Sequence, residues 1–161
     1  MIDSANPIDD CGENQESVDK KILDEFKKYE KGFTGKSKPM YWNHCGEKIT
    51  LKEIHDNANI GESSVVLIAV TREQYNLENF PKYRKYLKDV VKTDTIYYGL
   101  WPDTKNNKVE YDILYTIDTT NNDEIQKHLN LHNQINNGVA QKMALIIDKD
   151  GNWRIQNNEN L

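Results

Sequence analysis

Two histidines, His128 and His132, have the residue type and spacing that most directly indicate chemistry. They lie four residues apart in the stretch "HLNLH", and on a helix this spacing places two imidazoles on one face. Such a pair can bind zinc when a third ligand joins it, but the glutamate of the H-E-x-x-H motif is absent, because Leu129 follows His128. The candidate third ligands are Glu124, Asp112, Asp118 and His44. The spacing alone is a weak metal signal, and we expect no bound metal and no cofactor.

A helix drawn through residues 125–139 gives these histidines a definite position. Its apolar face consists of Ile125, Leu129, Ile135 and Val139. His132 falls near the middle of that face, His128 at its edge, and Asn136 one turn beyond His132. Three interpretations stay open: core histidines bonded by tyrosine hydroxyls, the polar contacts of a ligand cavity, or a metal site. The residues predicted for a ligand site are His128, His132, Asn136, Tyr111 and Tyr115.

The elements that must position this helix are predicted from the chain after Ser63. "SVVLIAV" is typical of a strand buried on both faces, and "YNLENFPKYRKYLKDVVK" has helical spacing with Pro81 in its first turn. "TIYYGLW" and "VEYDILYTI" have the residues of strands, and "KMALIID" returns through "KDGN" to "WRIQ" as a hairpin. The order strand, helix, strand, strand, helix, strand predicts a ferredoxin-like βαββαβ fold of the α+β class. Its four-stranded antiparallel sheet would carry two helices on one face and have "SVVLIAV" and "VEYDILYTI" at its centre.

The chain before this region is expected to contribute less to the core. Residues 1–17 are acidic and nearly devoid of large apolar side chains, which predicts a disordered tail. Residues 18–62 are expected to form a small α/β extension, with a helix in "VDKKILDEFKKYEKG" and a strand in "MYWNHC". A short helix in "LKEIHDNA" would begin at the capping box of Thr50 and Glu53. Residues 63–161 would form the ferredoxin-like domain.

The two cysteines, Cys11 and Cys45, are expected to stay reduced. The chain begins with neither the basic start nor the apolar stretch of a secretory signal, so we predict a cytoplasmic location, where thiols remain reduced. Cys45 follows His44 directly in "NHCG". Neighbouring side chains of a strand point to opposite faces, which argues against a Cys–His couple at this position. We interpret Cys45 as a buried, inert residue.

Composition and short motifs restrict the remaining function classes. The net charge of −5 disfavours nucleic acid as the main partner, because phosphate binding needs a basic surface. "PKYRKYLK" mixes basic and aromatic residues, which keeps nucleic-acid binding open, although a solvated helix face explains it more simply. No apolar run approaches the ~20 residues needed to cross a membrane. "DKDGN" resembles the start of a calcium loop but favours a hairpin turn, and the frequent asparagine pairs are interpreted as codon bias.

The function predicted from these observations is that of a small soluble ligand-binding or interaction module. The open face of the sheet would carry Tyr, Val and Ile side chains, and such an apolar patch is typical of an interface. We therefore expect self-association as a homodimer or a larger oligomer, with a small molecule as a further candidate partner. Two alternatives stay open: a small enzyme with a His128/His132 cavity or metal site, and a nucleic-acid-binding domain. Enzymatic activity stays uncertain, because neither G-x-S-x-G nor C-x-x-C occurs in the sequence.

Overall fold

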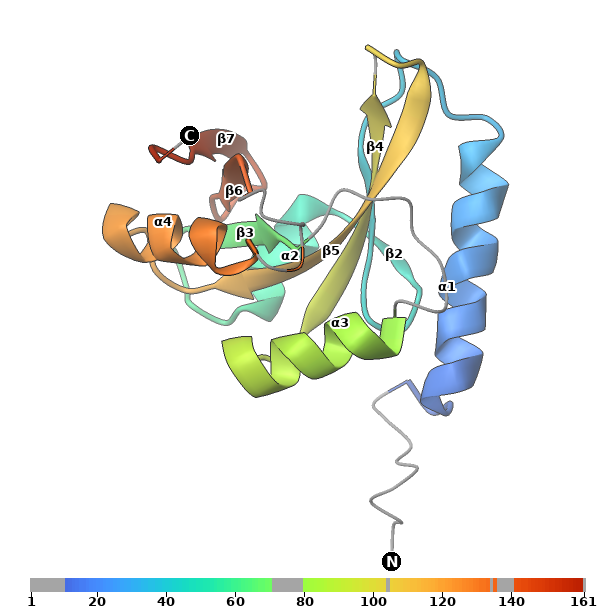
Figure 1. The fold of residues 1–161 in the computed structure, drawn as a ribbon, viewed down its shortest axis with the longest axis horizontal. Coiled ribbons are helices and arrows are strands. Elements are labelled where there is room, and N and C mark those ends of the chain that lie inside the picture. The colour runs from blue at the N-terminus through green and yellow to red at the C-terminus, as the bar shows by residue number, and fades with distance from the viewer. Residues whose placement is uncertain (1–10, 71–79, 104, 134, 136–140, 161) are drawn as a thin grey trace, which may run out of the picture.

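The computed structural model describes residues 11–70, 80–103, 105–133, 135 and 141–160. In these ranges the chain forms an antiparallel sheet of seven strands in the order β2-β1-β4-β5-β3-β6-β7, together with four α-helices and one π-helical segment (Figure 1). None of the helices in this part of the chain is long and apolar enough to cross a membrane.

The strands and helices have the following bounds. The strands are β1 (Met40–Trp42), β2 (Lys48–Ile49), β3 (Val65–Ala69), β4 (Ile96–Asp103), β5 (Lys108–Ile117), β6 (Met143–Ile147) and β7 (Trp153–Asn157). The helices are α1 (Gln15–Glu30), α2 (Leu51–Asn57), α3 (Phe80–Tyr86), the π-helical η1 (Leu87–Val91) and α4 (Asn122–Leu131).

The α+β class and the antiparallel sheet are confirmed, and the ferredoxin-like arrangement is not. Strands β3 and β5, predicted as the central pair, do lie side by side in the middle of the sheet. The sheet nevertheless has seven strands, because β1 pairs with β4 through Met40↔Leu100 and β7 pairs with β6 through Leu145↔Ile155. Strands β1 and β2, from the predicted extension, therefore belong to the same sheet as β3 to β6.

The two faces of the sheet are covered differently. Tyr111, Ile113 and Tyr115 of β5 are buried in one apolar cluster with side chains of α1, α3 and α4. Leu114 of β5 lies in a second cluster on the opposite face, with Ile54 of α2. The open face was expected to carry Tyr, Val and Ile side chains, and for Tyr111 and Tyr115 this expectation is wrong. Three helices cover the face that holds these tyrosines, and the opposite face holds only the short helix α2 among the described elements.

Capping and ion pairing fix the helices. Asn14 caps α1 by accepting the N–H of Ser17 at 2.8 Å, and the predicted capping box of Thr50 and Glu53 begins α2. On the covered face, the Arg84 guanidinium of α3 donates two hydrogen bonds to the Asp19 carboxylate of α1, at 2.6 and 3.0 Å.

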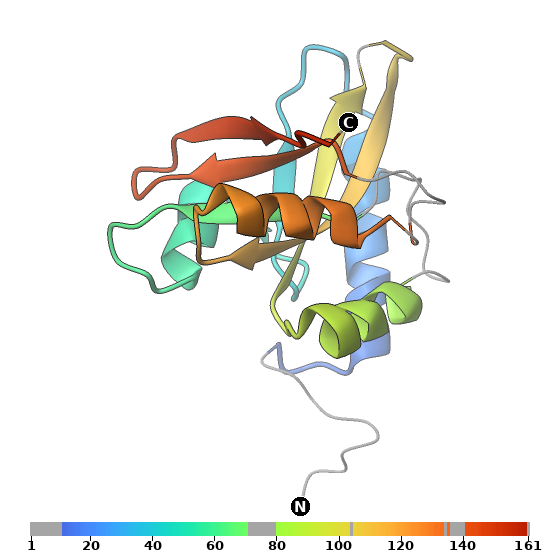
Figure 2. The same cartoon turned by 60° about the vertical axis from the view of Figure 1, so that its left-hand side comes forward.

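Helix α4 is tied to the C-terminal end of the chain by side-chain amides. Gln126 donates to the carbonyl of Asn157 at 2.8 Å and accepts the N–H of Glu159 at 2.7 Å. The amide of Asn158 donates to the side chain of Asn130 at 3.0 Å. Figure 2 shows the result: the β6–β7 hairpin (red) runs beside α4 (orange). These side-chain amides therefore join α4 to the end of the chain.

Cys11 and Cys45 form a disulfide, with Cα atoms 5.3 Å apart. The prediction that both thiols stay reduced is therefore wrong. The physical reason is tertiary: the tip of the β1–β2 hairpin packs against α1, so closely that a Cβ at Gly46 would lie 3.1 Å from Ile22 Cγ1. This packing brings Cys45 beside the segment that precedes α1. Residues 1–10 of the predicted tail lie outside the described residues. Disulfides are rare in the cytoplasm, so this bond gives no support to the predicted cytoplasmic location. That location stays a prediction.

Candidate functional site

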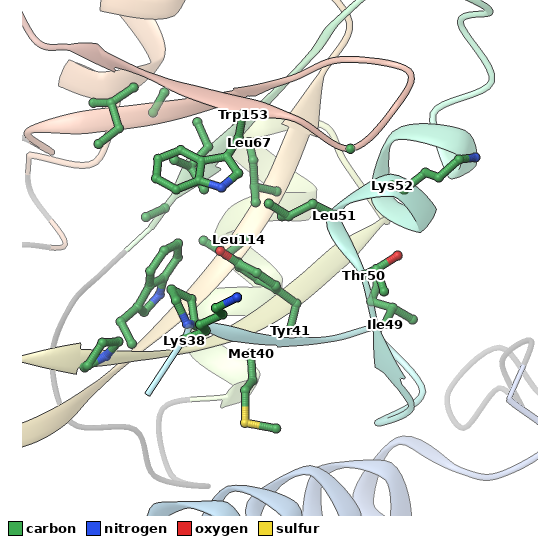
Figure 3. Close-up of a pocket in the computed structure, with 18 of the residues that line it drawn as sticks. Lys38, Met40, Tyr41, Ile49, Thr50, Leu51, Lys52, Leu67, Leu114 and Trp153 are labelled. Carbon is green, nitrogen blue, oxygen red and sulfur yellow. The ribbon is translucent and has the colours of Figure 1, made fainter. Parts of the chain in front are cut away.

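A groove of about 1450 Å³ lies on the α2 face of the sheet (Figure 3). Its floor is apolar and comes from the central strands, with Leu67 of β3, Leu114 of β5 and Leu145 of β6. Its sides are formed by the edge regions of the sheet, namely Tyr41, Trp101, Trp153 and Ile155. The groove forms here because side chains alternate between the two faces of each strand. One set lies under the three helices, and among the described elements only α2 covers the other set.

Exposed apolar side chains stand at the β7 side of this groove. Trp153 is 55% exposed and Ile155 is 45% exposed. Both point to the groove face, since residues two apart on a strand share a face. A tryptophan that is half in solvent beside an apolar hollow is an unusual surface feature, and exposed apolar patches of this kind are typical of binding sites.

The opposite wall of the groove is an aromatic pair that packs over a glycine. Trp101 packs edge-on against Tyr41, with ring centroids 5.4 Å apart. Its indole lies over Gly99 of the same strand, where an added Cβ would come within 2.8 Å of Trp101 Nε1. Burial, followed by the Asp112 carboxylate, raises the pKa of Tyr41 well above its usual range, so its hydroxyl remains protonated at neutral pH. The wall is therefore a packed aromatic pair with one neutral hydroxyl.

The rim of the groove carries charges of both signs. The charged residues that line it are Lys38, Lys48, Lys52, Glu110 and Asp150. Lys52 also forms an exposed ion pair with Asp56 at 2.8 Å, and the Lys48 ammonium lies 5.2 Å from the centroid of the Tyr29 ring. Charges of both signs therefore surround the apolar floor of the groove.

The histidine pair lies on the other, helix-covered face. The Tyr115 hydroxyl lies 2.7 Å from Nδ1 of His128 and 2.9 Å from Nε2 of His132. Tyr115 and His132 are fully buried, and His128 is half-buried. The rings of Tyr86 and His132 pack edge to face, with centroids 5.6 Å apart. One tyrosine hydroxyl therefore serves both imidazoles, as expected for the interpretation of a core pair bonded by tyrosine.

The protonation states of this cluster follow from its hydrogen bonds. His132 Nδ1 is buried with no hydrogen-bond partner among the described residues. The least costly arrangement has the Tyr115 O–H donating to His128 and the His132 Nε2–H donating to the Tyr115 oxygen, because no N–H is then left without an acceptor. Burial, and then the neighbouring His128, lower the pKa of His132 to about 4. Burial also lowers the pKa of His128, so both rings are neutral at pH 7.

The five predicted ligand-site residues do not form one site. His128, His132 and Tyr115 come together as described. Tyr111 instead faces α1, where it stacks on Phe26 at 5.3 Å between centroids and donates a hydrogen bond to Glu30. Asn136 lies outside the described residues. Helix α4 ends at Leu131, earlier than predicted, and His132 is its C-cap residue.

A third cluster consists of Cys11, His44 and Cys45, whose ligand atoms all lie within 4.8 Å of one another. The expectation that His44 and Cys45 diverge assumed a strand, but residues 43–46 form a turn. Asn43 Oδ1 accepts the N–H of Cys45 at 2.9 Å, and Gly46 adopts a φ of +80°. Neighbouring side chains on a turn can point to one place, and these do.

The residues of the groove were not identified from the sequence. Trp101 lies in the predicted strand "TIYYGLW" and Trp153 in the predicted hairpin, but no local signal indicates that these side chains and Tyr41 line one groove. The available signal was the tryptophan next to "KDGN", since a large apolar residue on an expected edge strand is notable. Comparisons with protein-family models, with curated protein sequences and with solved structures found no match to this chain.

Proposed function

We propose that this protein is a binding module, that the groove on the α2 face is its binding site, and that the occupant is a second copy of the chain. The observation that carries the proposal is the 55% exposed Trp153 beside an apolar hollow of about 1450 Å³. The partner's Trp153 would enter the groove of the first copy, and Trp153 of the first copy would enter the partner's groove.

The size of the groove favours a macromolecular occupant. Pockets for drug-sized ligands enclose about 300–1,000 Å³ and bury most of the ligand. This groove is larger, at about 1450 Å³. An element of another protein fills such a space better than a small molecule does.

The positions of Trp153, of the groove and of the rim charges favour a second copy in particular. A twofold dimer uses the same surface on both subunits, so that surface must be complementary to itself. Here Trp153 and the groove lie on the same face of the sheet. The rim carries lysines such as Lys38 and also the acids Glu110 and Asp150, so the cations of one copy can meet the anions of the other. We further propose that β3 to β6 with α3 and α4 form a ferredoxin-like unit, to which β1, β2 and β7 are additions.

The histidine cluster supports a structural role better than an enzymatic one. Tyr115 and His132 are both fully buried, and the hydroxyl between the rings already bonds to both of them. A general base needs access to a substrate proton. The basic helix α3 gives little support to nucleic-acid binding, because Tyr83 is buried and so is not available for base stacking.

Sedimentation analysis of the full chain tests the proposal. Wild-type protein at micromolar concentration should sediment as a dimer. Trp153→Ala should raise the dissociation constant at least about thirtyfold, which corresponds to the ~2 kcal/mol typical of a central interface residue. Val90 on η1 is the matched control, because it is also an exposed apolar residue, at 49%, and lies away from the groove. Val90→Ala should leave the dissociation constant unchanged.

Two results would contradict the proposal. A wild-type chain that stays monomeric throughout the concentration range would exclude the second copy as occupant. Equal dissociation constants for wild type and Trp153→Ala would place the dimer contact elsewhere. A monomer that binds a fluorescent apolar dye, with binding lost in Leu114→Lys, would instead support a small-molecule function for the groove.

A further inference from the structure

We propose that Cys11, His44 and Cys45 form a zinc site when the disulfide is reduced. The disulfide and the metal site are then two alternative states of the same three side chains. The expectation from the sequence was that no metal binds, and the zinc site considered there was built on His128 and His132, with His44 as one of four candidate third ligands.

The geometry of the three side chains supports this assignment. Zinc binds thiolate sulfur at about 2.3 Å and imidazole nitrogen at about 2.0–2.1 Å, so tetrahedral ligand atoms lie roughly 3.5–4 Å apart. The three ligand atoms here already lie within 4.8 Å of one another while the two sulfurs are bonded. Breaking the S–S bond lets the sulfurs move apart by the small distance that a metal between them requires.

The hairpin that carries two of the ligands is preorganised. Asn43 Oδ1 accepts the backbone N–H groups of both Cys45 and Glu47, at 2.9 and 3.0 Å. Gly46 packs against Ile22 of α1, directly beside the segment that carries Cys11. These contacts do not involve the disulfide, so they hold His44 and Cys45 in place after the bond is reduced. A preorganised ligand set loses less conformational entropy when the metal binds.

The ligand types and their exposure define the class of metal and of site. Two thiolates and an imidazole suit zinc, and their two negative charges balance its two positive charges. Cys45 is 9% exposed, whereas Cys11 and His44 are partly exposed. With three protein ligands among the described residues and access from solvent, the fourth position is open to water, as in zinc sites that exchange a ligand. His128 and His132 belong to no such group in the part of the chain that the structure describes.

The change between the two states balances with ordinary thiol chemistry. A dithiol reductant supplies two electrons and two protons, the Cys11–Cys45 bond breaks to give two thiols, and the reductant closes to its own disulfide. Zinc then displaces one proton from each thiol into solvent. A disulfide oxidant reverses the change: the thiolates lose two electrons and form the S–S bond, zinc leaves, and the oxidant takes up two protons and becomes two thiols.

Titration of the full chain with cobalt, a spectroscopic substitute for zinc, tests the site. The protein is reduced with a dithiol, freed of reductant under nitrogen, and titrated with Co²⁺ alone and then with Zn²⁺. We expect thiolate-to-cobalt charge-transfer absorption that saturates at one metal per chain, appears only after reduction and is removed by zinc. Cys45→Ser should abolish the absorption. His44→Ala should weaken cobalt binding at least about tenfold, and His128→Gln, which removes a histidine outside this cluster, should leave it unchanged.

Each other result counts against the proposal. Reduced wild-type protein that keeps its circular dichroism and shows no charge-transfer absorption would exclude the site. Equal affinity in His44→Ala would remove His44 from the ligand set and leave only a pair of thiolates. If reduction unfolds the chain, zinc should restore the native circular dichroism, and failure to restore it would also overturn the proposal.

Discussion

Acidification should destabilise the protein through His132. The pKa of this imidazole falls from its ordinary value of 6.5 to about 4 in the folded chain, so the unfolded chain binds more protons between these two pH values. The contribution of neutral His132 to stability is therefore complete above pH 6.5 and is lost as the pH falls towards 4. A shift of this size corresponds to about 3 kcal/mol of unfolding free energy.

A non-titrating variant isolates this contribution from that of the carboxylates. Urea denaturation of wild type and His132→Gln, followed by circular dichroism at several pH values from 7 to 4, gives the difference in unfolding free energy. We expect wild type to be more stable at pH 7 and the difference to shrink by about 3 kcal/mol at pH 4. His128→Gln should show the same trend with a smaller change, because His128 is only half-buried. A difference that does not vary with pH would refute the assignment of His132 as a buried, neutral imidazole.

Three further predictions concern other parts of the structure. Tyr115→Phe removes the hydroxyl that serves both histidines and should lower the unfolding free energy at pH 7 by about 1–3 kcal/mol; a neutral effect would mean that the histidines do not depend on it. Gly99→Ala forces a Cβ to within 2.8 Å of Trp101 Nε1. It should lower the unfolding free energy by about 1–3 kcal/mol and change the tryptophan emission spectrum; an unchanged spectrum would contradict the packing. Reduction of the Cys11–Cys45 bond, which closes a loop with a sequence separation of 34, should lower stability by up to about 4 kcal/mol, and Cys11→Ser should match reduced wild type in a denaturant series.

Local signals were sufficient to predict most of the secondary structure. The β-branched run gave β3, the pattern of Thr50 and Glu53 gave the start of α2, and Asp150-Gly151 gave the β6–β7 turn. Each of these depends on interactions between residues close in sequence, or on burial that repeats along one element. The central positions of β3 and β5 were predicted in a different way, because the order of strands and helices indicated a topology whose first and third strands are central.

Contacts between segments that are far apart in the sequence account for the predictions that were wrong. Tyr111 and Tyr115 share a face and a strand, and only the helix packed above each decides that one bonds to Glu30 and the other to the histidines. The disulfide depends in the same way on how the β1–β2 hairpin packs against α1. Asn158 is a third case: its burial and its hydrogen bond to Asn130 depend on α4 meeting the end of β7.

The amide of Gln126 has a consequence for growth of the sheet beyond β7. The backbone groups of Asn152 and Asn158 form hydrogen bonds on the β6 side of β7. Because hydrogen-bonding direction alternates along a strand, the backbone groups of Trp153, Ile155 and Asn157 point away from β6. Another strand could pair with such an exposed edge. Gln126 accepts from Glu159 and donates to Asn157, much as one residue of an added strand would. An incoming strand could therefore pair with the outward backbone groups near Trp153, whereas Gln126 of α4 already occupies those at the Asn157 end. The edge that is available for strand-to-strand aggregation is shorter as a result.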